Sequence, residues 1–186
     1  VQMNLLSTHD TDRLLTALAG EDAAGRSRQW KHDHPLPPAR RAAGLELAAL
    51  AATIQFFMPG VPCVYYGDEI GMEGYSDPFN RGCFPWGREN DGGMPALYRW
   101  LGTVRAACPA LRQGLYRTRA AEGGLFAFER GEGEERLLCA VNRSDGPASL
   151  PAGLFDGFRP LPFFGKAEPA GCLGPRSFRL FAAGGW

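Results

Sequence analysis

Residues 60–72 read GVPCVYYGDEIGM, a β-prone run followed by a polar turn. The uninterrupted run 61–67 is typical of a parallel strand that is buried on both faces. A long loop rich in Gly, Asp and Pro, residues 68–93, comes next. We therefore expect a parallel strand whose carboxyl end opens into a long loop.

Helical patterns lie on both sides of this strand. Residues 40–58 carry apolar side chains on two faces, which predicts a helix that is covered on two sides, and Pro59 with Gly60 ends it. Residues 95–108 favour another helix, with a proline in its first turn and Pro109 closing it. Both patterns suit helices that cross over a parallel sheet.

The N-terminal part predicts a first strand and helix. Residues 1–6 are mostly apolar and favour a buried strand, and the helix after it has Asp10 or Thr11 available as its cap and Gly20 at its end. Residues 21–38 are polar and rich in Arg, His and Pro, which indicates a surface loop. The resulting order is strand, helix, long helix, strand, loop, helix.

The pattern changes after about residue 113. Short runs that alternate as half-buried strands do are separated by Gly, Pro and Asp clusters, at 115–120, 125–129, 136–142, 158–164 and 177–181. Their spacing predicts a small antiparallel sandwich. We expect two domains, an α/β part over 1–112 and an all-β part over 113–186.

Two β/α units are too few for an independent parallel sheet. A closed (β/α)8 barrel typically needs roughly 250 residues, and this chain has 186. Either the chain is a fragment, or a partner covers the exposed edge and the inner face of the sheet.

Composition excludes several classes of protein. Twenty Lys and Arg balance twenty Asp and Glu, which argues against binding nucleic acid or an anionic membrane. Residues 42–58 are too short and too interrupted for a membrane span. The five cysteines are an odd number without a CxxC pair, so we expect free thiols in a reducing compartment and a cytoplasmic location. Residues 1–6 show no signal peptide, and the chain lacks an initiator methionine.

Two polar clusters are candidate sites. His9 and Asp10 follow the first predicted strand, and Asp77 and Arg81 lie in the loop after the second. In a barrel, side chains beyond the carboxyl ends of strands point into the active-site mouth. The structural alternatives are an N-cap carboxylate beside a loop histidine for the first pair, and a tight turn with a surface ion pair for the second.

Both clusters resemble conserved regions of one family. Residues around His9 and Asp10 resemble the fourth conserved region of the α-amylase superfamily (glycoside hydrolase family 13), and YYGDEIGM (65–72) with its DPxxR loop resembles the seventh. The neopullulanase, cyclomaltodextrinase and maltogenic amylase group is the most similar. The resemblance implies the last two β/α units of a (β/α)8 barrel followed by an antiparallel β-sandwich domain.

The family mechanism is retaining and needs a nucleophilic carboxylate and an acid/base carboxylate roughly 5–5.5 Å apart. In the family both precede the region that this chain matches, so the chain alone is expected to be inactive. Asp10 matches the third family carboxylate, which hydrogen-bonds sugar hydroxyls and helps to distort the ring, and His9 matches its neighbouring histidine. Asp77 and Arg81 match the pair that contacts glucose units on the non-reducing side.

The chain departs from the family pattern at two points. Thr8 stands where many members have Asn directly before the His-Asp pair. The loop sequence Asn80-Arg81-Gly82 lacks the second Arg often found in the neopullulanase group. The family assignment is therefore firmer than the subgroup assignment.

Other polar and aromatic residues receive structural interpretations. Glu69 is expected to support the strand end rather than to pair with Asp10 as a second catalytic carboxylate. The sequence His32-Asp33-His34 is more often solvated than metal-binding in a polar loop, and we expect neither a metal nor a cofactor. Aromatic residues of the long loop either stack on sugar or pack the loop itself: Tyr75, Phe79 and Trp86.

The expected function is that of the C-terminal portion of an α-glucan hydrolase or transglycosylase. Its substrate would be an α-glucan, a maltooligosaccharide or a cyclodextrin, and its apolar surface would be covered by self-association or by the N-terminal remainder of the barrel. The alternative is a non-catalytic binding or scaffold protein with an amylase-like fold. The coding sequence upstream of Val1 separates the two.

Overall fold

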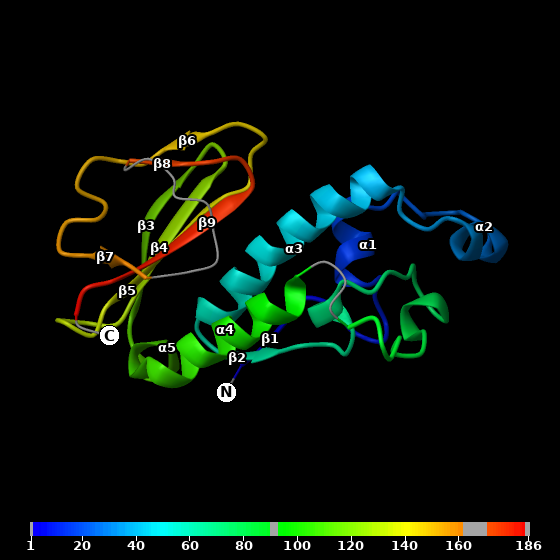
Figure 1. Cartoon of the computed structure of the whole chain (residues 1–186), viewed down its shortest axis with the longest axis horizontal. Coiled ribbons are helices and arrows are strands. Elements are labelled where there is room, and N and C mark those ends of the chain that lie inside the picture. Colours follow the sequence, from blue (N-terminus) through cyan, green and yellow to red (C-terminus); the bar gives the residue numbers. More distant parts are fainter. Residues whose placement is uncertain (1, 90–92, 162–170, 185–186) are drawn as a thin grey trace. The chain divides into compact units, whose positions relative to one another are not determined.

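The computed structural model describes residues 2–89, 93–161 and 171–184 (Figure 1). The chain divides into two compact units, described separately below. The first comprises Met3–Gln55 and Pro62–Gly102, and the second comprises Gln2, Phe56–Val61 and Thr103–Trp186. This division passes through two long helices. The expected boundary at 112/113 separates an α/β part from an all-β part instead, and it stays a prediction.

The first unit holds the expected order of elements, with one helix more. Its strands β1 (Met3–Leu5) and β2 (Val61–Cys63) form a two-stranded sheet. The helices, of which the long ones continue into the second unit, are α1 (Leu14–Ala19), α2 (Arg28–Asp33), α3 (Pro38–Phe57) and α4 (Met94–Ala107), with short 3-10 turns η1 (Asp68–Ile70) and η2 (Phe79–Arg81). The order of the predicted strands and helices is thus confirmed.

Three local predictions were wrong. Residues 28–33 form α2 inside the expected loop, because the Ser27 side chain accepts a hydrogen bond from the Trp30 N–H and caps the helix. Helix α1 begins at Leu14 with Arg13 as its N-cap residue, and neither Asp10 nor Thr11 caps it. The expected strand 61–67 ends at Cys63.

The strands are also less buried than predicted. Val61 is 46% exposed, and Met3 and Leu5 are 62% and 47% exposed. A parallel strand is buried on both faces only when neighbouring strands and crossover helices cover it. Among the described residues, each of these two strands pairs only with the other.

Helix α3 packs closely against α1. A Cβ atom added to Gly44 would lie 2.7 Å from Ala19 Cβ and 2.8 Å from Leu15 Cδ1, so only glycine permits this approach. Ala48 and Ala52 are buried on the same helix. Small residues on α3 therefore let the helices of the first unit pack tightly.

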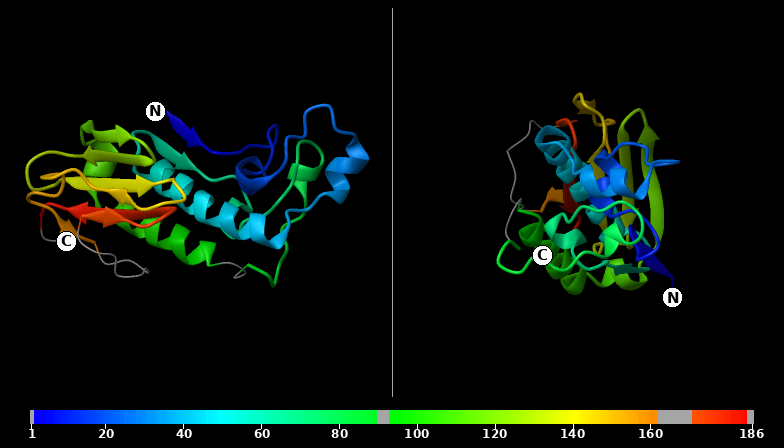
Figure 2. Two further views of the ribbon diagram at one scale, coloured as in Figure 1. Left: turned by 90° about the horizontal axis from the view of Figure 1, so that it is seen from above. Right: turned by 90° about the vertical axis from the view of Figure 1, so that its right-hand side faces the viewer.

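The second unit contains the antiparallel strands that the sequence predicts (Figure 2). Its five-stranded sheet has the order β3-β4-β5-β9-β7, and a separate pair joins β6 to β8. The elements are α5 (Pro109–Gln113), β3 (Tyr116–Glu122), β4 (Leu125–Arg130), β5 (Leu137–Asn142), β6 (Ala148–Ser149), β7 (Arg159–Pro160), β8 (Cys172–Leu173) and β9 (Ser177–Ala182). Residues 162–164 of the expected strand 158–164 lie outside the described residues.

Alternation along the strands builds the core of this unit. Ala127 pairs with Ala140, and Leu138 pairs with Phe181, so these side chains share one face of the sheet. Leu173 of β8 belongs to the same buried cluster. The small sheet therefore contributes to the core that the large sheet forms.

Arg130 is a buried cation at the base of this sheet, with 2% of its surface exposed. Its guanidinium donates hydrogen bonds to five backbone carbonyls, those of Phe57, Ala110, Leu111, Gly114 and Leu115. Helix ends leave carbonyls without intrahelical partners, and this one side chain satisfies such groups at the ends of α3 and α5.

We predict that Arg130→Met lowers the free energy of unfolding of the chain by about 3 kcal/mol, because buried carbonyls lose charge-assisted hydrogen bonds. Urea unfolding followed by circular dichroism measures the change. Arg117→Met, at an exposed position of β3, serves as the control and should change stability by less than about 0.5 kcal/mol. Equal effects of the two substitutions would contradict the role of Arg130.

Candidate functional site

The structure brings together all four residues that the sequence proposed as a site. His9 and Asp10 lie in the turn after β1, and Asp77 and Arg81 lie in the loop after β2. Arg81 Nε is 3.1 Å from Asp77 Oδ1, and Arg81 Nη2 is 3.8 Å from Asp10 Oδ1. His9 Nε2 is 3.2 Å from Asp10 Oδ2.

These four side chains are open to solvent, with 46% to 70% of their surfaces exposed. Exposed ion pairs add little to folding stability. The cluster places the Arg81 cation within ion-pair distance of two carboxylates, one of which lies beside the His9 imidazole, and all four side chains are accessible to solvent. Such a set of groups can hydrogen-bond a polyol.

Two threonines stabilise the turn that carries His9 and Asp10, because their hydroxyls accept hydrogen bonds from backbone N–H groups of the turn. The Thr8 N–H donates to Thr11 Oγ1 at 2.9 Å, and the Asp10 N–H donates to Thr8 Oγ1 at 3.1 Å. Thr8 is the position at which the sequence departs from the family pattern. Its hydroxyl is used here to shape the turn.

Asn80 also holds this turn, although the sequence analysis did not single this residue out. Its side chain is fully buried, and Nδ2 donates to the carbonyl oxygens of His9 at 2.8 Å and Thr11 at 2.7 Å. Arg81 Nε donates to the same His9 carbonyl at 3.1 Å. The only local signal is that Asn80 directly precedes Arg81.

Beneath the site lies Arg13, which is fully buried. Its guanidinium carbon is 4.5 Å and 4.4 Å from the ring centres of Tyr65 and Tyr66, and Nη1 donates to the Tyr66 carbonyl. Asp68 Oδ1 is 3.9 Å from Nη1. These contacts join the segment after β1 to the segment after β2, because Arg13 belongs to the first and its partners to the second.

Gly67 is required at this junction. Its φ is +88°, and an added Cβ would lie 2.9 Å from Arg13 Nη1 and 2.2 Å from Met72 Sδ. The Glu69 carboxylate accepts a hydrogen bond from the Gly67 N–H at 2.7 Å. The predicted hydrogen bond from Glu69 to loop backbone is thus present, but it lies in the segment after β2 rather than at the strand end, because β2 ends at Cys63.

Asp68 has an altered acidity. Burial raises the pKa of its carboxyl, and this effect exceeds the opposing effects of the Ser7 hydrogen bond and the Arg13 charge. Ser7 Oγ donates to Asp68 Oδ2 at 2.5 Å. The carboxyl thus belongs to the buried support of the site.

The His32-Asp33-His34 sequence lies in and after α2. His32 Nδ1 is 2.6 Å from Asp33 Oδ1, and this hydrogen bond is the main reason that the pKa of Asp33 is lowered. The His34 ring stacks on Trp30, with ring centres 4.1 Å apart. In the part of the chain that the structure describes, no group of three or more His, Cys, Asp or Glu side chains could hold a metal ion.

The loop aromatics differ in burial and in their ring contacts. Tyr75 is 4% exposed, and its ring packs 5.3 Å from Trp30, so it anchors the loop. Phe79 contacts the edge of His32 with ring centres 5.7 Å apart, and Trp86 is 82% exposed.

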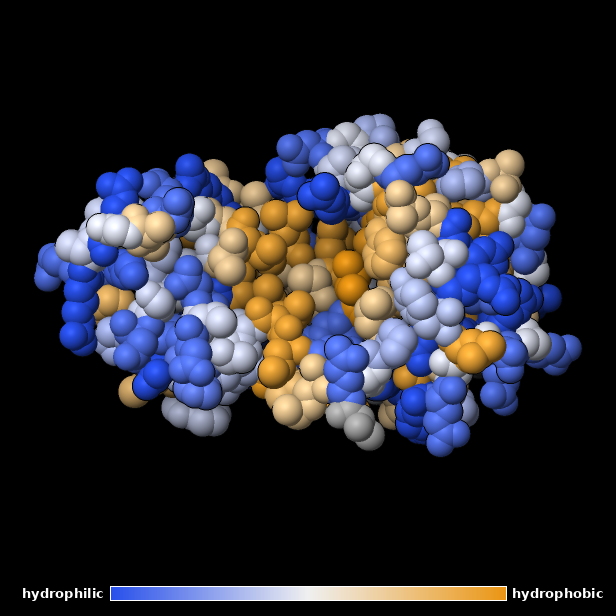
Figure 3. All heavy atoms as spheres, turned by 180° about the vertical axis from the view of Figure 1, so that it is seen from behind, coloured by the Kyte–Doolittle hydropathy of each residue, from blue (hydrophilic) through white to orange (hydrophobic). Residues whose placement is uncertain are grey.

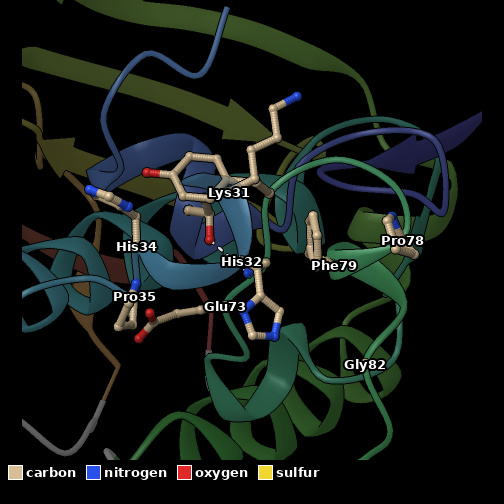
Figure 4. A pocket seen from close by; sticks show the side chains of 11 residues that line it. Lys31, His32, His34, Pro35, Glu73, Pro78, Phe79 and Gly82 are labelled. Atoms are coloured by element: carbon tan, nitrogen blue, oxygen red, sulfur yellow. Dashed lines mark hydrogen bonds between the residues drawn. The ribbon is translucent and has the colours of Figure 1, made fainter. Parts of the chain in front are cut away.

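A pocket of about 330 Å³ adjoins the site loop on the side of α2 (Figure 4). Lys31, His32 and Glu73 contribute polar groups, and Phe79 an aromatic ring. Lys31 Nζ donates to Ser76 Oγ at 3.0 Å, which ties α2 to this loop. The pocket therefore shares Pro78, Phe79 and Gly82 with the loop of Asp77 and Arg81.

Comparison with known proteins identifies the family. The family described as "Alpha amylase, catalytic domain" matches residues 1–107, more than half of the chain. The chain belongs to the α-amylase family. This confirms the resemblance noted in the sequence and places the chain in a glycoside hydrolase context.

The relatives are much longer than this chain. An amylopullulanase of Thermoanaerobacter thermohydrosulfuricus is 37% identical over 128 residues, which cover 69% of this chain and 8% of that protein. A cyclomaltodextrinase of Bacillus sp is 34% identical over 153 residues, covering 81% of this chain and 23% of that protein. The native debranching enzyme of Nostoc punctiforme matches with a TM-score of 0.72 at 30% identity, covering 98% of this chain and 35% of that one. The chain thus spans less than a quarter of these curated relatives and about a third of the solved structure.

No helix within the described ranges combines the length and apolar character needed to cross a bilayer.

We predict that Asp68→Asn changes the pH dependence of stability. Because the folded pKa of Asp68 is raised, the folded state holds this proton more tightly than the unfolded chain. Stability from this group is complete below the unfolded pKa of about 3.9 and is lost as pH rises through the folded value. The free energy of unfolding of the unsubstituted chain should therefore fall relative to Asp68→Asn as pH rises above about 4.

Urea unfolding between pH 3.5 and 8 measures this difference. Asp156→Asn, at an exposed turn of the second unit, gives the matched control. A difference between the chain and Asp68→Asn that stays constant over this range would contradict the assigned effect of burial.

Proposed function

We propose that this chain is the C-terminal portion of a retaining α-glucan hydrolase. It supplies the last two β/α units of a (β/α)8 barrel and an antiparallel β-sandwich domain. The observation that carries the proposal is the convergence of His9 and Asp10 with Asp77 and Arg81, residues about seventy positions apart in the sequence. These are the positions that match the sugar-binding residues of the family.

In this proposal Asp10 accepts hydrogen bonds from sugar hydroxyls at the cleavage subsite, and His9 binds the same sugar unit. These charge-assisted bonds strengthen as the ring distorts toward the oxocarbenium-like transition state. Arg81 sits between Asp10 and Asp77 and fixes their spacing. Asp77 and Arg81 bind glucose units on the non-reducing side.

The nucleophile and the acid/base lie outside this sequence in the proposal. Both would have to stand roughly 5–5.5 Å apart across the scissile bond. Names of the relatives, cyclomaltodextrinase and amylopullulanase, support a maltooligosaccharide, cyclodextrin or α-glucan as the substrate. The five free cysteines support a reducing, cytoplasmic compartment.

The chain should bind maltotetraose without cleaving it. In a ¹⁵N NMR titration, signals of residues 8–12 and 77–82 should move, and Asp10→Asn should weaken binding about tenfold or more, since a hydrogen bond to a charged group contributes about 1.5–3 kcal/mol. Asp22→Asn, at an exposed loop position of the same unit, should bind like the unsubstituted chain.

Cleavage is measured in the same samples. No reducing sugar should appear from maltotetraose, cyclodextrin, pullulan or p-nitrophenyl maltoside. Hydrolysis by the pure chain that Asp10→Asn abolishes would contradict the assignment of both reacting carboxylates to residues elsewhere. Failure of the unsubstituted chain to bind would contradict the sugar-binding role of the site.

Apolar side chains exposed around β1 and β2 favour association with further strands. Met3, Leu5 and Val61 are among the most exposed large apolar residues, and hydrophobic side chains gather on the face drawn in Figure 3. Large bare apolar patches mark interaction surfaces in soluble proteins. In the proposal, the rest of the barrel or a second copy of the chain covers this sheet.

The chain by itself should therefore self-associate. Sedimentation velocity at tens of micromolar should show oligomers, and Leu5→Thr with Val61→Thr should shift them toward monomer, because both substitutions reduce exposed apolar area and keep β propensity. Leu18→Gln, an exposed position of α1, is the control and should leave the oligomers unchanged. A monodisperse unsubstituted chain at all concentrations would argue against this surface.

A further inference from the structure

Asn80 is a fully buried amide in an exposed functional loop. It lies in η2 between Asp77 and Arg81 of the candidate site. Its two Nδ2 donors reach two carbonyls on the other segment, His9 O at 2.8 Å and Thr11 O at 2.7 Å. The contact therefore crosses between the two segments that form the site.

The orientation of this amide follows from its partners. A primary amide has two N–H donors, and both are engaged. The flipped amide would set its oxygen against two carbonyl oxygens, so only the observed orientation is favourable. No donor among the described residues reaches Oδ1, which is buried.

Packing alone does not account for an amide at this position. An apolar side chain of similar volume would bury no unsatisfied acceptor. The amide stabilises the structure only through its two N–H donors. The carbonyls that they bind belong to the residues on either side of Asp10. Fixing His9 O and Thr11 O fixes the backbone at Asp10 and hence the point from which its carboxylate projects.

Asn80 and Arg81 contact the turn in different ways, one buried and one exposed. Arg81 reaches the side chain of Asp10 at 3.8 Å as well as the His9 carbonyl, and both Arg81 and Asp10 are open to solvent. Within the described ranges, the hydrogen bonds of the Asn80 side chain all go to backbone carbonyls, and this side chain is shielded from water. A bound sugar can replace the exposed contact between Arg81 and Asp10, whereas the buried hydrogen bonds of Asn80 stay in place.

We infer that Asn80 is a positioning residue: its amide clamps the turn 9–11 so that His9 and Asp10 present their side chains at a fixed place. This inference rests on the proposed function only for the consequence that sugar binding depends on Asn80. The positioning of the turn by the Asn80 amide depends only on the two hydrogen bonds to His9 O and Thr11 O.

The decisive variant is Asn80→Asp, which keeps the shape of the side chain. An ionised carboxylate donates no hydrogen bond and would face two carbonyl oxygens, while the protonated form restores one donor. Ser76→Ala removes a hydroxyl from the same loop without touching the turn 8–11 and is the matched control.

The first readout is the NMR signals of the backbone carbonyl carbons of His9 and Thr11 and of the amides that follow them. Asn80→Asp should shift these signals at pH 7, and they should move back toward those of the unsubstituted chain as the introduced carboxyl is protonated. Ser76→Ala should leave them unchanged. Shifts confined to residues 77–82, with the turn 9–11 unaffected, would overturn the inference.

A second measurement covers the case in which Asn80→Asp does not fold. Scalar couplings through the hydrogen bonds of the unsubstituted chain should link Asn80 Nδ2 to the carbonyl carbons of His9 and Thr11, and their absence would overturn the clamp. Maltotetraose affinity at pH 7 should fall about tenfold in Asn80→Asp but not in Ser76→Ala. If maltotetraose does not bind the unsubstituted chain, the proposed function fails while the carbonyl signals still decide the role of Asn80.

Discussion

The burial of Arg13 is the constraint on which the candidate site depends. A guanidinium removed from water must regain its hydration energy from the protein. Arg13 regains part of it from two tyrosine rings, a hydrogen bond from Nη1 to the Tyr66 carbonyl and the nearby charge of Asp68, while Nε and Nη2 have no hydrogen-bond partner among the described residues. All of these partners follow β2 while Arg13 follows β1, so the contacts of this one side chain join the two segments that carry the site.

The exposed site and its buried support have different chemical tasks. The side chains of His9, Asp10, Asp77 and Arg81 are charged or polar and open to solvent, as recognition of a polyol requires. Their geometry depends on groups that no ligand would touch, above all the buried amide of Asn80. Rigid support of exposed groups is what a precise binding site needs.

The sequence predicted the helices and strands of both units more accurately than the burial of the strands. Helical periodicity located α3 within two residues of its observed ends, and alternation located β4, β5 and β9. Helix α2 was missed because its signal is a single capping serine in a polar stretch. The burial of β1 and β2 was overestimated because burial depends on neighbouring strands, which local composition does not reveal.

The sequence by itself determined the order of strands and helices and the antiparallel tail, and it singled out the four residues of the candidate site, since periodicity, turn residues and short motifs are local properties. Only the tertiary structure decided the roles of Asn80, Arg13 and Arg130. Their partners lie as many as 73 positions away, and most of them are backbone carbonyls. Every residue carries a carbonyl, so no side-chain pattern marks which ones a distant amide or guanidinium will bind.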